Sequence, residues 1–67
     1  MKIRIKIIRD GDNKVTRNEV VENRTPADAM LLAMIENHDH ARLQDRKAKR
    51  LKITTPRNYT YFAEEIE

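Results

Sequence analysis

The sequence contains no cysteine and no serine, and it has only two histidines. Without cysteine, neither a disulfide nor a thiolate zinc site can hold the fold together. Without cysteine or serine, the usual pairing of a nucleophile with a histidine base cannot be assembled within one chain. We therefore expect a protein that is not an enzyme and that depends on its apolar core or on a partner chain for stability.

Long apolar runs are also missing. The first residues alternate lysine or arginine with isoleucine, so they contain neither the apolar centre of a secretory signal nor a membrane span. With 67 residues the chain is expected to form a single domain, residues 1–67. These features predict a cytoplasmic protein without membrane contact.

Metal and cofactor sites find little support in the spacing of polar residues. His38 and His40 are two residues apart, and Asp39 or Asp45 would have to complete a site in a geometry that the sequence does not fix. No glycine-rich loop is present, and Asp28 places a negative charge in the first turn of the expected helix, where it would repel a phosphate. We expect neither a metal nor a cofactor.

The N-terminal third has the pattern of a β-hairpin. Residues 2–9 alternate in polarity, as in a half-buried strand, and the Asp10–Asn13 segment has turn chemistry. In the next run, residues 14–22, one strand register buries Val15 and Val21 and the other buries Val20. A bulge or an edge position would reconcile the two registers.

A helix is expected to begin at Thr25, whose hydroxyl can cap the first free N–H groups, with Pro26 at the first helical position. The helix ends near Asn37, in a left-handed cap, or continues past Leu43. Its apolar stripe is expected to pack on the isoleucines of the first strand. The stripe, with Met30 beside it, comprises Ala27, Leu31, Met34, Ile35 and His38.

The C-terminal third predicts a second pair of strands. Leu51 and Ile53 alternate with polar neighbours, residues 55–58 read as a turn, and residues 59–63 have aromatic strand chemistry. The expected fold is therefore α+β in the order ββαββ, with a small antiparallel or mixed sheet and one helix packed on one face.

The charge pattern favours a nucleic-acid partner. The formal net charge is +3, and a sheet covered by one helix leaves its other face in water. Cations on that face and in the basic segment 42–57 could contact phosphates, and tyrosines could stack on unpaired bases. The candidate nucleic-acid-binding residues are Lys2, Arg4, Lys6, Arg42, Arg46, Lys47, Lys49, Arg50, Lys52, Arg57, Tyr59 and Tyr61.

The position of the tyrosines depends on the register of the last strand. If Phe62 faces the helix, Tyr59 and Tyr61 join the cations on the uncovered face. In the opposite register the tyrosines belong to the core and Phe62 is exposed, and no tyrosine platform forms. The cations would then form a solvated face that protects the sheet edges from aggregation.

A protein partner is the alternative. Small chains with exposed strand edges can dimerise or add a strand to another protein, and Met30, Leu32 and Met34 could offer an adaptable apolar surface. Small proteins of this composition are common among phage and mobile-element accessory factors that inhibit a host protein. The second hypothesis is therefore an inhibitor or adaptor that binds an acidic host protein, with a homodimer as one form.

Overall fold

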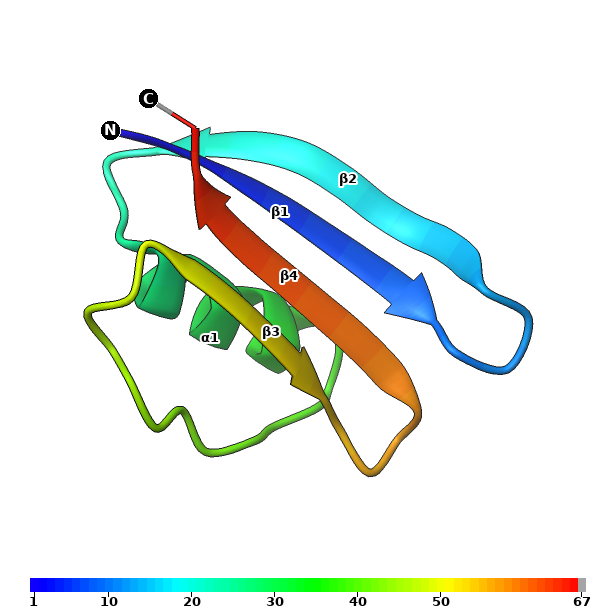
Figure 1. Ribbon diagram of the computed structural model, residues 1–67. Coiled ribbons are helices and arrows are strands. Elements are labelled where there is room, and N and C mark those ends of the chain that lie inside the picture. Colours follow the sequence, from blue (N-terminus) through cyan, green and yellow to red (C-terminus); the bar gives the residue numbers. More distant parts are fainter. Residues whose placement is uncertain (67) are drawn as a thin grey trace.

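The computed structural model describes residues 1–66 and contains four strands and one helix (Figure 1). The elements follow one another along the chain as β1 (Lys2–Arg9), β2 (Lys14–Glu22), α1 (Pro26–Glu36), β3 (Arg50–Thr54) and β4 (Tyr59–Glu65). No helix within residues 1–66 is long and apolar enough to cross a membrane.

The four strands form one antiparallel sheet in the spatial order β2-β1-β4-β3, and the helix lies against one face of it (Figure 1). The first and last strands of the chain are therefore neighbours at the centre of the sheet. This arrangement confirms the α+β class and the single helix on one face. We call the sheet face that the helix does not cover the open face.

Alternation along β1 builds the core. Ile3, Ile5 and Ile7 point towards the helix and are almost fully buried, because successive side chains of a strand point to opposite faces. On β4, Ala63 pairs with Ile5 and Tyr61 pairs with Ile7, so these two residues lie on the same covered face. Both are buried, which closes the core between the two central strands and the helix.

The helix begins as its sequence predicts: the Thr25 hydroxyl accepts a hydrogen bond from the Asp28 N–H at 3.2 Å, and Pro26 occupies the first turn. The predicted stripe is wrong at Ile35, which is 68% exposed, and at His38, which is exposed, whereas its Ala27 and Met34 are buried, as is Met30 beside it. The helix instead turns its small side chains and two methionines to the sheet, so that it can approach closely. The buried residues are Pro26, Ala27, Ala29, Met30, Ala33 and Met34.

The helix ends at Glu36, with Asn37 as the C-cap residue, and does not continue past Leu43. The left-handed backbone conformation expected at Asn37 is found one residue later, at His38, where φ is 55°. The chain then runs without helix or strand through residues 38–49, and Leu43 anchors this segment in the core with 8% exposure.

Both features that could reconcile the two registers of β2, an edge position and a bulge, are present. The strand lies at the edge of the sheet, and its pairing with β1 shifts so that Ile7 faces Arg17 while Ile8 faces Val15. The extra residue, Thr16, makes a β-bulge. As a result Val15 and Val20 share the open face, where they are 45% and 44% exposed.

Asp39 holds the segment after the helix against the sheet. Its carboxylate is 6% exposed and accepts hydrogen bonds from the Thr55 hydroxyl at 2.5 Å, the Tyr61 hydroxyl at 3.0 Å and the His40 N–H at 2.9 Å. Burial acts to raise the pKa of Asp39, but these hydrogen bonds and the charge of Arg57 together outweigh it, so the pKa is lowered from its ordinary value.

We expect Asp39 to make the protein acid-sensitive. A carboxyl group whose pKa is lowered on folding stabilises the native state above its unfolded pKa of about 3.9 and loses that contribution as the pH falls through the folded value. Asp39→Asn should lower the free energy of unfolding at pH 7 by about 1–3 kcal/mol, because donors that meet the carboxylate lose their acceptor. Urea unfolding at pH 7 and at pH 3 measures this, and the difference between variant and wild type should shrink at pH 3. An equal difference at both pH values would contradict the role of the charged carboxylate.

Candidate nucleic-acid interface

The centre of the open face is a cross-strand row of one aromatic ring between two lysines. Phe62 on β4 is paired with Lys6 on β1 and with Lys52 on β3. Directly opposed residues on neighbouring strands have Cβ atoms about 5 Å apart, so both lysine side chains lie beside the Phe62 ring. The Lys52 Nζ atom lies 5.5 Å from the centroid of the Phe62 ring.

The next row towards the chain termini is charged throughout. Glu64 on β4 is paired with Arg4 on β1 and with Arg50 on β3, and Arg50 Nε lies 3.5 Å from the Glu64 carboxylate. Arg4 also donates a hydrogen bond of 3.1 Å to the side-chain oxygen of Asn18 on β2. These contacts leave the Glu64 side chain 41% exposed, so its carboxylate remains accessible from the open face.

At the end near the hairpin turns, the strands present apolar side chains and threonine hydroxyls on the open face. Ile8 on β1 is paired with Val15 on β2 and with Thr60 on β4. The Thr60 hydroxyl lies 3.0 Å from that of Thr54 and donates to the Asp10 carboxylate at 2.7 Å. The charged groups of the open face are thus concentrated at the end that lies near the chain termini.

A shallow hollow of about 270 Å³ lies on the open face between the Phe62 row and the Glu64 row. This volume is slightly below the range of about 300–1,000 Å³ that is usual for sites of drug-sized ligands, and it suits one planar group better than a larger molecule. The hollow is lined by Arg4, Lys6, Asn18, Arg50, Leu51, Phe62, Ala63 and Glu64.

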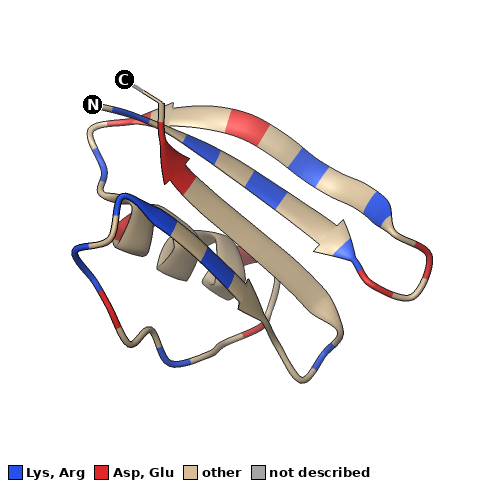
Figure 2. Cartoon of the chain, viewed as in Figure 1, with Lys and Arg blue, Asp and Glu red and all other residues tan. Residues whose placement is uncertain are grey.

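The open face carries more cations than carboxylates. Pairing and alternation place five cations of β1 and β3 on it, against the two strand carboxylates Glu22 and Glu64 and the Asp10 carboxylate, which accepts from the Thr60 hydroxyl. Figure 2 shows the basic residues along β1 and β3. The five cations are Lys2, Arg4, Lys6, Arg50 and Lys52. A face with this balance attracts anionic partners.

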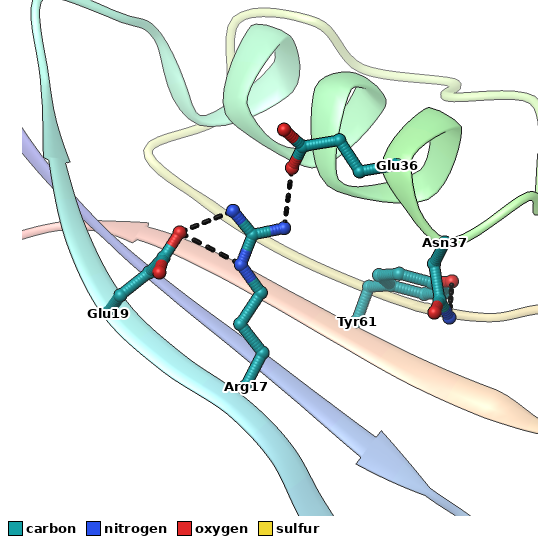
Figure 3. Close-up of polar contacts among 5 residues, drawn as sticks. All are labelled: Arg17, Glu19, Glu36, Asn37 and Tyr61. Carbon is teal, nitrogen blue, oxygen red and sulfur yellow. Dashed lines mark hydrogen bonds and ion pairs between the residues drawn. The ribbon is translucent and has the colours of Figure 1, made fainter.

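The two tyrosines do not contribute to the open face. Tyr61 is 1% exposed on the covered face, where the Asn37 side-chain amide donates to its hydroxyl at 2.8 Å (Figure 3). Burial is the largest influence on Tyr61 and raises its pKa. Tyr59 is half-buried on the same side. Of the two registers that the sequence allows, the structure has the one in which Phe62 faces outwards, so the tyrosine platform does not form.

Arg17, one of the two cations of β2, is directed away from the open face. Its guanidinium donates to Glu19 on the same strand and, at 2.6 Å, to Glu36 at the end of the helix (Figure 3). These two carboxylates raise the pKa of Arg17. The cluster links the edge strand to the helix, so Arg17 serves the fold and not the open face.

The basic residues after the helix lie apart from the hollow. Arg42, Arg46, Lys47 and Lys49 are exposed on the segment before β3, and in the described chain they are not among the residues that line the hollow. Arg57, in the β3–β4 turn, donates to the His38 carbonyl at 2.5 Å. From the basic segment 42–57, the structure places Arg50 and Lys52 on the open face with the cations of β1.

Sequence reasoning did not include Phe62, Glu64 and Asn18 among the candidate site residues. The sequence places Phe62 on the open face in only one of two registers, and the predicted aromatic strand, residues 59–63, stops before Glu64. The structure instead continues β4 through Glu65, and the Ile66 N–H donates to the Lys2 carbonyl at 3.0 Å. In this register Leu51 pairs with Ala63 and Ile53 pairs with Tyr61, and the alternation along β3 does not by itself determine which residues of β4 lie opposite.

Within residues 1–66, no group of three or more histidine, aspartate or glutamate side chains is placed to hold a metal ion. Comparison of the chain with models of known protein families, with curated proteins and with solved structures finds no match. The geometry of the open face is therefore the observation that bears on function.

Two truncations of neighbouring residues test the register of β4. Tyr61→Ala should lower the free energy of unfolding by about 3–5 kcal/mol, because it empties a buried aromatic position, and in a chain of this size it could abolish cooperative unfolding. Phe62→Ala should cost about 1 kcal/mol or less, because the ring is half-exposed and leaves no closed cavity. Urea unfolding followed by circular dichroism compares the two, and a larger cost for Phe62→Ala would show that the register is wrong.

Proposed function

We propose that the protein is a non-catalytic binding module that contacts single-stranded nucleic acid through the open face of its sheet. The observation that carries the proposal is the row in which Phe62 lies between Lys6 and Lys52. An aromatic ring offers a stacking surface for an unpaired base, and the flanking lysines can contact the phosphates on either side. Arg4 and Arg50 extend the cationic surface along the strands.

The contact between Lys52 and Phe62 supports this proposal. A cation near an exposed aromatic ring contributes about 0.5–1 kcal/mol, whereas a base stacked on the ring contributes about 1–3 kcal/mol. A base can therefore displace the Lys52 ammonium from the ring with a net gain. The displaced ammonium, on its flexible side chain, then becomes available for a phosphate.

Charge and burial weaken two of the alternatives, a second copy of the chain and an apolar contact with a host protein. A second copy stacked through this face would place two surfaces of the same sign against each other, which is unfavourable. The adaptable apolar surface considered for a host protein is also reduced, because Met30 and Met34 are buried against the sheet. An acidic protein remains the second candidate partner, because its charge would complement the cations Arg4, Lys6 and Lys52 of the open face.

Binding to single-stranded oligonucleotides should depend steeply on salt. If four cations contact phosphates, raising NaCl from about 50 mM to about 200 mM should weaken binding about fiftyfold, and Lys6→Ala should reduce the slope of log Kd against log salt by about 0.7. Phe62→Ala should weaken binding by about 1–3 kcal/mol through the loss of stacking. Fluorescence anisotropy with labelled oligonucleotides of about nine nucleotides measures all three effects.

Lys14→Ala is the matched control, because it removes the same charge from an exposed residue at the far end of β2. It should leave both the affinity and the salt slope close to those of the wild type. Absence of binding at about 50 mM NaCl, or an equal loss in Lys6→Ala and Lys14→Ala, would contradict the proposal.

A further inference from the structure

We propose that the hollow beside Phe62 selects guanine, with Glu64 as the residue that reads the base. This inference rests on the proposed function, because it assigns a base preference to the same face. Phe62 and Glu64 lie two residues apart on β4 and therefore project from the same side of the sheet. The hollow lies between them, so a base stacked on the ring has its edge towards the carboxylate.

The surroundings of Glu64 make its carboxylate available to a ligand. Its contact to Arg50 is a single approach of 3.5 Å, and the Arg50 side chain is 84% exposed. An exposed ion pair of this kind contributes little and can open. A base that supplies two N–H donors can therefore replace the guanidinium as the partner of the carboxylate.

Guanine is the base that complements this arrangement. Its Watson–Crick edge presents two adjacent donors, N1–H and N2–H₂, and next to them the acceptor O6. A carboxylate has only acceptors, and Arg4 and Lys6 have only donors. Glu64 can thus accept from both guanine donors while one of the neighbouring cations donates to O6.

The other three bases place an acceptor against the carboxylate. Adenine and cytosine each present one amino donor beside a ring-nitrogen acceptor, and thymine or uracil presents one N–H between two carbonyl oxygens. Each of these edges places at least one acceptor lone pair against the Glu64 carboxylate. A polar group left unpaired at such a contact costs binding free energy. The carboxylate therefore discriminates as much by repulsion of the wrong bases as by attraction of guanine.

The test uses single-stranded DNA of about nine nucleotides that is thymidine except at its central position, which is guanine, adenine, cytosine or thymine. The wild-type chain should bind the guanine strand at least about fivefold more tightly than the other three, the lower limit for a good two-bond contact to a base. Fluorescence anisotropy at low salt gives the four dissociation constants.

Glu64→Gln separates base reading from charge. The variant should lose the preference for guanine while binding the other three strands as well as the wild type or more tightly, because one negative charge has left the face. Glu22→Gln removes the same charge from the open face outside the hollow, and it should keep the preference for guanine.

Equal affinity for the four strands, or a guanine preference that survives in Glu64→Gln, would overturn the assignment of Glu64 and leave the proposed function standing. A uniform gain for all four strands in Glu64→Gln would also overturn it, because the carboxylate would then act only through its charge. Absence of salt-sensitive binding to every strand would instead contradict the proposed function itself.

Discussion

The register of β4 between β1 and β3 is the constraint on which the rest of the structure depends. It turns Tyr61 under the helix, where its hydroxyl joins the hydrogen bonds that hold Asn37 and Asp39. The same register turns Phe62 outwards, between the two lysines that are paired with it. A shift by one residue would exchange the two faces along the whole strand. One choice of pairing therefore sets both the core and the proposed binding surface.

The helix covers one face of the sheet closely, and this limits where a binding site can lie. The helix contacts β4, β1 and β3 through small side chains and two methionines, so the space beneath it is filled. The ion pairs of Arg17 with Glu19 and Glu36 extend this cover towards the edge strand β2. Within residues 1–66 this packing leaves little interior volume for an enclosed site, which favours the sheet surface as the place where the proposed partner would be recognised.

The regular parts of the fold could be predicted from the sequence, because local patterns determine them. The alternation in β1, the turn residues after it and the cap at Thr25 each act over a few positions. The orientation of the helix and the register of β4 could not be predicted, since they depend on contacts between distant segments. Ile35 looked like a core residue by spacing alone, yet the alanines pack against the sheet in its place. Glu64 became a candidate only once β4 was known to continue past it.

The rows of the open face differ from one end of the strands to the other. Near the chain termini the surface carries Arg4, Glu64 and Arg50, and near the hairpin turns it carries Ile8, Val15 and the threonine hydroxyls. The bulge at Thr16 contributes to this difference, because it brings Val15 onto the same side as Val20. An extended chain laid along the strands would thus meet non-equivalent surroundings in its two possible directions. If the proposed nucleic-acid partner binds in this way, the two ends of the face offer a physical basis for preferring one strand polarity, 5′ to 3′ or 3′ to 5′, independently of base sequence.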